Sequence, residues 1–64
     1  MTTRLELDYD GETLTVTGEY FHQSPAEFCV MKVEHNGLDV TDHYRKYRMI
    51  PALEDMALEM IEGD

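Results

Sequence analysis

The chain has 64 residues, 42% of them hydrophobic, and carries 14 Asp and Glu against five Lys and Arg, a formal net charge of -9. A chain of this length predicts a single small domain, residues 1–64, with little room for the deep pocket in which most enzymes hold a substrate, so we expect no enzymatic activity. Its negative charge repels nucleic acids and anionic membranes, and direct binding to either is therefore not expected.

The first predicted element is a β-hairpin. Apolar and charged residues alternate from Leu5 to Tyr9, the period of a half-buried strand. Asp10-Gly11 then favours a two-residue type I′ turn, and apolar residues alternate with threonines after it. A turn at these two residues brings apolar side chains together on one face. The register that it predicts pairs Leu7 with Leu14, Leu5 with Val16 and Tyr9 with Glu12.

A turn-rich connection around Ser24-Pro25 leads to a second predicted hairpin. Residues 28–33 are apolar on both faces, which is typical of an interior strand. Alternation places Phe28 and Val30 on one face and Cys29, Met31 and Val33 on the other. Asn36-Gly37 favours a second type I′ turn, and the like-charge pair that this turn creates is mildly destabilising. The predicted pairs are Val33 with Val40 and Glu34 with Asp39.

Two helices are predicted after this hairpin. Thr41 is expected to be the N-cap of a short helix over residues 42–48, with the basic residues Arg45, Lys46 and Arg48 near its favourable C-terminal end. Pro51 suits the first turn of a second helix, which Gly63 closes. The apolar residues of this helix form one stripe that faces a core. They are Leu53, Met56, Ala57, Met60 and Ile61.

Together these elements predict an α+β fold. A small antiparallel sheet of two β-hairpins, with three or four strands, packs on a C-terminal helix that follows a short helix. No apolar run has membrane-spanning length and Met1–Arg4 does not resemble a signal peptide, so we expect a cytoplasmic protein. A lone cysteine, Cys29, excludes an internal disulfide.

No group of residues indicates catalysis, a metal or a cofactor. His22, His35, His43 and Cys29 are the residues that suit a borderline metal, but their spacings match no zinc pattern. We expect the histidines at the surface and Cys29 in the core as a small apolar residue. The sequence contains no Gly-rich phosphate loop and no arrangement of a nucleophile with a base. We therefore predict no catalytic residue, no metal and no cofactor.

The distribution of acidic residues is the strongest indication of function. These residues either serve solubility or form a rigid array, because alternate residues of a strand lie about 6.5–7 Å apart. Such an array can imitate a nucleic-acid backbone for a protein that binds one. The candidate contacts on the hairpins are Glu6, Asp8, Asp10, Glu12, Glu34 and Asp39, and a second set on the last helix is Glu54, Asp55 and Glu59.

Three segments, Leu14–Tyr20, Pro25–Phe28 and Val33–Asp42, resemble a group of short acidic proteins encoded by phages and prophages. In size and acidity the chain is also similar to anti-CRISPR proteins, several of which block DNA binding by presenting a carboxylate surface to the effector complex. The resemblance implies a phage-type inhibitor that binds a host nucleic-acid-binding protein and competes with DNA. A CRISPR surveillance complex in a bacterial cytoplasm is the implied partner.

The alternative is a non-catalytic phage accessory module that acts through self-association or docking to another protein. An exposed strand edge or a group of aromatic side chains would form its interface. The aromatic candidates are Tyr20, Phe21, Tyr44 and Tyr47. Salt separates the two hypotheses, because exposed charges are screened beyond about 8–10 Å at physiological ionic strength. In either case we expect a monomer or a weak homodimer.

Overall fold

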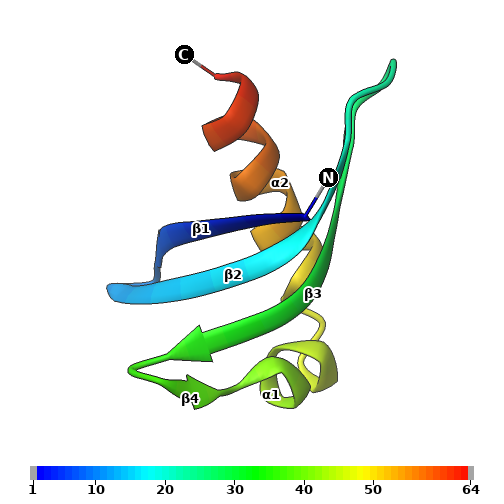
Figure 1. Ribbon diagram of the computed structural model, residues 1–64. Helices are drawn as coiled ribbons and strands as arrows, with labels where there is room; N and C mark the ends of the chain where they lie inside the picture. The colour runs from blue at the N-terminus through cyan, green and yellow to red at the C-terminus, as the bar shows by residue number, and fades with distance from the viewer. Residues whose placement is uncertain (1, 64) are drawn as a thin grey trace.

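The computed structural model describes residues 2–63, which form a four-stranded antiparallel sheet and two helices (Figure 1). The strands lie in chain order: β1 (Thr2–Tyr9), β2 (Glu12–Phe21), β3 (Glu27–His35) and β4 (Leu38–Asp39). The helices are α1 (Thr41–Lys46) and α2 (Ile50–Glu62). The predicted α+β fold, two hairpins packed on a C-terminal helix that follows a short helix, is confirmed.

The first hairpin has the predicted turn and register. Asp10 and Gly11 adopt φ angles of 52° and 80°, the left-handed conformations that a type I′ turn requires at both central positions. Glycine reaches this region without a clash from a Cβ atom. The pairing of Leu7 with Leu14, Leu5 with Val16 and Tyr9 with Glu12 is as predicted.

The second hairpin also turns where the sequence predicts. The Asn36-Gly37 turn has φ angles of 53° and 81°, and Glu34 lies opposite Asp39. Although β4 ends at Asp39, Val40 still donates its backbone N–H to the carbonyl of Val33 at 2.8 Å. The pairing of these two valines therefore continues the hairpin beyond the short strand.

A β-bulge interrupts the pairing of β2 with β3. Thr17 pairs with Lys32, and the next residue, Gly18, pairs with Val30. Met31 is therefore an extra residue in β3, and the alternation of its side chains shifts by one position there. A Cβ atom at Gly18 would lie 2.5 Å from the ring of Phe28. β2 and β3 therefore approach each other closely at this point.

The bulge corrects two predictions about β3. Phe28 and Val33 are 3% and 0% exposed and belong to the same core, although simple alternation placed them on opposite faces. Cys29 is exposed, so the prediction that it packs in the core is wrong. Because the bulge adds one residue between Phe28 and Val33, both side chains reach the helix-covered face, and Cys29 points to the other face.

The junction between the sheet and α1 differs from the prediction. Thr41 is the first residue of the helix and Val40 is its N-cap, without a side-chain cap hydrogen bond. The Thr41 hydroxyl instead accepts the backbone N–H of Val33 at 2.8 Å and donates to Asp39 at 2.6 Å. Its hydroxyl therefore ties the helix to the hairpin. The helix also ends two residues earlier than predicted, and Arg48 beyond it has a φ of 58°.

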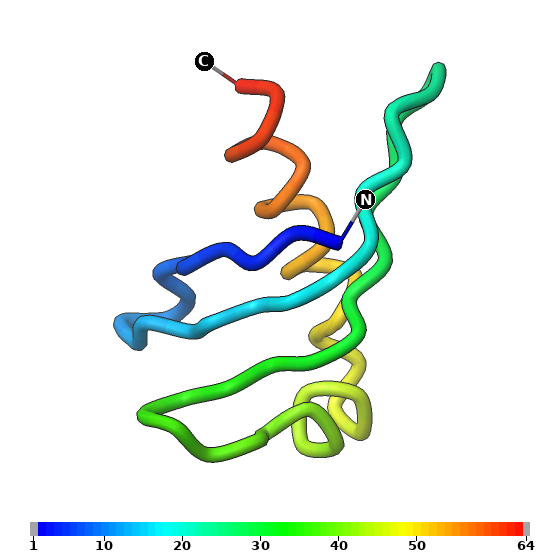
Figure 2. The backbone as a smooth tube through the Cα atoms, viewed as in Figure 1, coloured from blue at the N-terminus to red at the C-terminus, as the bar shows by residue number. Residues whose placement is uncertain are grey.

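The apolar stripe of α2 is buried at its centre but not at its end. Leu53 and Ala57 are completely buried, and Met56 and Ile61 are half-buried against the core. Met60 is 57% exposed, contrary to the prediction, because the C-terminal turns of α2 extend past β1 (Figure 2). No helix within residues 2–63 is long and apolar enough to cross a membrane.

Candidate functional site

The helices cover one face of the sheet, and the residues that alternate with the core positions form the other, open face. Antiparallel pairing arranges these residues in rows across neighbouring strands, which lie about 4.8 Å apart. We call the row that contains three carboxylates the acidic row: Glu6, Thr15, Glu34 and Asp39. Asp8 and Thr13 form the row on one side of it, and Arg4, Thr17 and Lys32 form the row on the other.

The hydrogen bonds and ion pairs of these carboxylates restrict where their charges lie. Lys32 lies 3.4 Å from Glu34, and Asp8 accepts a hydrogen bond from the Thr13 hydroxyl at 3.1 Å. Glu34 lies opposite Asp39 across the second hairpin, and the positive charge of Lys32 offsets the repulsion between these two carboxylates. The open face is therefore an ordered polar surface with two cations beside its acidic half.

Asp39 is the most firmly held carboxylate of the acidic row. It accepts the Thr41 hydroxyl at 2.6 Å and the Thr41 backbone N–H at 2.9 Å. These two bonds, the hydroxyl first, lower the pKa of the Asp39 carboxyl, and the positive charge of Lys32 adds to them. Asp39 therefore stays ionised at neutral pH. Its oxygen Oδ1 accepts both bonds from Thr41, so the carboxylate stabilises the junction with α1 and also contributes negative charge to the open face.

The predicted contacts on the first hairpin do not all share this face. Glu6 and Asp8 lie on the open face, and Asp10 is in the turn at the end of the hairpin. Glu12 pairs with Tyr9, which packs against the core, so Glu12 points to the helix-covered side. Tyr44 is a core residue beneath β1 and β2. Its burial is the main reason that its pKa is raised, and the negative charge of Glu12 is the next.

The second predicted set lies on α2, across the sheet from the acidic row. Glu54 is half-buried and accepts the backbone N–H of Val30 at 3.0 Å, so it supports β3 next to the bulge. Asp55 and Glu59 are exposed on the helix. The nine predicted contacts therefore divide between two sides of the molecule and do not form one binding surface.

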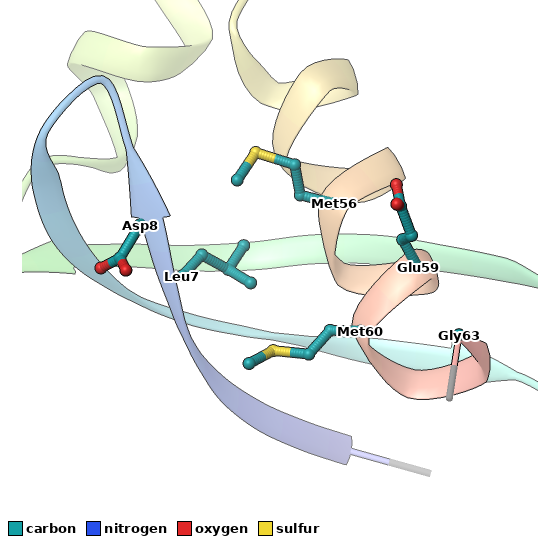
Figure 3. A pocket seen from close by; sticks show the side chains of 6 residues that line it. All are labelled: Leu7, Asp8, Met56, Glu59, Met60 and Gly63. Atoms are coloured by element: carbon teal, nitrogen blue, oxygen red, sulfur yellow. The ribbon is translucent and has the colours of Figure 1, made fainter.

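A groove between β1 and α2 is a feature that the sequence did not reveal. It is open to solvent, has a volume of about 430 Å³, and is lined by Leu7, Asp8, Met56, Glu59, Met60 and Gly63. Leu7 and the two methionines point into the space between the strand and the helix, whereas Asp8 points to the other side of β1 (Figure 3). An open groove of this kind suits a side chain of another protein better than an enclosed small ligand.

His22 and His43 are exposed, as predicted, and contact aromatic residues, whereas His35 is half-buried. His22 lies 3.1 Å from the Tyr20 hydroxyl, which donates to Glu62 at 2.9 Å. The ring of His43 lies 4.9 Å from that of Tyr47. Burial, followed by the bond to Glu62, raises the pKa of Tyr20. Within residues 2–63, no three His, Cys, Asp or Glu residues are arranged to hold a metal ion.

No protein-family model matches the chain, and the comparisons with curated proteins and with solved structures found no match. The resemblance to phage-encoded and anti-CRISPR proteins therefore stays a prediction.

Proposed function

We propose that the protein is a non-catalytic inhibitor that binds the cationic nucleic-acid site of a host protein through its open sheet face. The observation that carries the proposal is the acidic row, which crosses all four strands in register: Glu6 lies on β1, Glu34 on β3 and Asp39 on β4, with Thr15 of β2 between Glu6 and Glu34. As an anti-CRISPR-like protein it would act in the bacterial cytoplasm, with a CRISPR surveillance complex as the candidate target.

The spacing of the carboxylates supports this function. Neighbouring strands lie about 4.8 Å apart, and alternate residues of one strand about 6.5–7 Å apart. These separations are of the same order as those of phosphate charges, which occur about every 3.4 Å of axis on one DNA strand. Because Asp8, Glu34 and Asp39 already make hydrogen bonds or an ion pair, less side-chain entropy is lost when they meet a cationic groove.

The charges on the open face are distributed unevenly on the two sides of the acidic row. Arg4 and Lys32 lie on the side of the acidic row away from the two hairpin turns, which share one end of the sheet (Figure 1). Asp8 and Asp10 lie on the side toward the turns. A cationic partner is therefore expected to approach over the turn end of the open face.

The test uses two variants that change the net charge equally on opposite sides of the molecule. Glu34→Lys reverses a charge in the acidic row, and Asp55→Lys does so on the exposed side of α2. We expect the first to lower the affinity for the target at least about tenfold, the effect of about 1.4 kcal/mol, and the second to leave it nearly unchanged. Glu34→Lys should lower stability by no more than about 1 kcal/mol, because the partner of Glu34 in its ion pair, Lys32, is exposed to solvent.

The target would be captured on the immobilised protein from lysate of the bacterial host, eluted with duplex DNA, and identified. Its DNA binding would then be measured by gel shift with each variant as competitor. Elution by DNA and a selective loss of competition by Glu34→Lys would support the proposal. A target that DNA does not displace, or an equal loss of competition in both variants, would contradict it.

The accessory-module alternative loses part of its predicted interface. Tyr44 is buried at 6% exposure, and Tyr20 is hydrogen-bonded to His22 and Glu62. Phe21 and Tyr47 stay exposed. Of the two interfaces proposed for this alternative, the exposed strand edge is favoured over the aromatic group, because β1 is an edge strand of eight residues.

A further inference from the structure

The outer edge of β1 presents its backbone to solvent. β1 lies at one end of the strand order, and among the described residues no strand pairs with its outer side. In a two-residue hairpin the pair that flanks the turn exchanges both backbone hydrogen bonds, and alternate pairs repeat this pattern. Tyr9, Leu7 and Leu5 therefore bond to β2, while the N–H and C=O groups of Glu6 and Asp8 point outward.

The opposite edge of the sheet is protected. β4 has two residues, and the neighbouring N–H groups of β3 are bound by side chains from the helices. The Thr41 hydroxyl accepts the N–H of Val33 at 2.8 Å, and the Glu54 carboxylate accepts that of Val30 at 3.0 Å. β1 has eight residues, so it is the long edge that an added strand can use.

The groove lies directly beside this edge on the helix-covered side. Leu7, Met56 and Met60 point into it (Figure 3), and Met60 is 57% exposed. In an added strand, the residues opposite Leu5 and Leu7 would point to the same side of the sheet as these side chains. Apolar side chains at those positions would cover the exposed Met60, and methionine adapts easily to the shape of an incoming side chain.

The charges around the edge determine which strand fits. Glu6 and Asp8 lie on the open side of β1, and Glu59 lines the groove on the helix side. A second copy that placed its Glu6 opposite Asp8 would bring carboxylates together, and in every register two chains that each carry a net charge of -9 repel each other. Self-association through this edge is therefore disfavoured, whereas cations opposite Glu6 and Asp8 are attracted.

We propose that β1 and the groove bind an extended cationic segment of another protein as an additional antiparallel strand. Lys or Arg side chains of that segment lie over Glu6 and Asp8, and the apolar residues between them enter the groove against Leu7, Met56 and Met60. Backbone hydrogen bonds to Glu6 and Asp8 supply affinity, and the alternation of basic and apolar residues supplies specificity. This inference does not depend on competition with nucleic acid.

The test uses the peptide acetyl-Lys-Val-Lys-Val-Glu-Val-Thr-amide. In antiparallel register its lysines face Asp8 and Glu6, its glutamate faces Arg4, and its first two valines face the groove. Binding to the full chain would be measured by NMR titration at low salt. We expect saturable shifts of the Glu6 and Asp8 amides and of the Met56 and Met60 methyl groups. A titration without saturable shifts at these positions would overturn the proposal.

Two matched peptides separate strand addition from simple charge attraction. Methylation of both lysine backbone nitrogens removes the two donors that face β1, whereas methylation of the first two valine nitrogens blocks groups that point away. We expect the first to weaken binding at least about tenfold relative to the second, because two hydrogen bonds are lost together. The reversed sequence has the same composition and should bind more weakly. Equal affinities of all these peptides would overturn the proposal.

Two protein variants test the groove. Met60→Glu adds a charge inside it, and Met31→Glu adds the same charge at an equally exposed methionine, each 57% exposed, on the bulge of β3. We expect Met60→Glu to weaken binding of the parent peptide at least about tenfold relative to Met31→Glu. Equal effects would show that the groove is not used. Thermal unfolding of both variants would verify that they remain folded.

Discussion

A single hydroxyl joins the sheet to the helical part of the molecule. The Thr41 side chain is buried and bonds both to the Val33 N–H and to Asp39. Sequence patterns suggested a helix cap, since threonine before an acidic residue is common at helix N-termini. In the structure the same hydroxyl replaces the hydrogen-bond partner that the short β4 does not provide. A residue with a familiar local role thus has a tertiary role here.

We expect Thr41→Val to destabilise the protein by about 1–3 kcal/mol, because the substitution keeps the shape but leaves the buried Val33 N–H without its acceptor. Thr13→Val is the matched control. The Thr13 hydroxyl bonds to Asp8 at the exposed surface, so its loss should change stability by less than about 0.5 kcal/mol. Urea unfolding of the two variants and the parent measures the difference. Equal destabilisation would contradict this role of Thr41.

At the scale of elements, the hairpins were predictable and the bulge was not. Asp10-Gly11 and Asn36-Gly37 are local signals, and each determines the register of the strands beside it. The bulge lies where Gly18 closely approaches Phe28, two residues ten positions apart on different strands. Alternation within β3 alone cannot reveal it, so Phe28 and Val33 were wrongly predicted on opposite faces and Cys29 was wrongly predicted in the core.

In the candidate site, the acidic row was predictable from the sequence and the groove was not. The predicted register already paired Glu12 with Tyr9, and this pairing places Glu12 on the core side of β1 and β2. The acidic row follows from the register once β2 and β3 are paired. The groove was not predictable, because helical periodicity shows which residues share a face but not where the sheet beneath them ends. That limit explains the unexpected exposure of Met60.

The C-terminal end of α2 carries charge of the unfavourable sign. Glu59 and Glu62 lie in its last turn, which contains no basic residue, although carboxylates there oppose the helix dipole. We expect Glu59→Lys to stabilise the protein by about 0.3–1 kcal/mol, from the dipole and from a favourable pair with Asp55 four residues earlier. Asp55→Lys, in the middle of the helix, is the control for net charge and should stabilise less.

Thermal and urea unfolding would compare these two variants with the parent. The Glu59→Lys variant should also bind the cationic peptide more weakly, because Glu59 lines the groove. A gain in stability together with a loss of binding indicates that the carboxylate is retained for a partner rather than for the fold. If Glu59→Lys does not stabilise more than Asp55→Lys, the dipole argument is wrong.

At the scale of the whole molecule, the net charge of -9 acts on folding and on binding in opposite directions. Like charges repel one another in the compact state and lower its stability. The ion pairs that the structure contains include an exposed one, Arg45 with Asp42 at 4.0 Å, and one in which only the lysine is exposed, Lys32 with the half-buried Glu34 at 3.4 Å. Such pairs contribute little, so repulsion is expected to dominate the response to salt.

We therefore expect the thermal midpoint to rise as NaCl increases from 10 to 300 mM, since the screening length falls from about 30 Å to below about 10 Å. A variant with both Asp55→Lys and Glu59→Lys has less charge to screen and should show a smaller rise. A midpoint that falls with salt would mean that attractive pairs dominate. Binding of a cationic partner should weaken over the same range. If salt raises the thermal midpoint while it weakens the complex, the loss of binding does not result from unfolding and indicates that charges at the interface are screened.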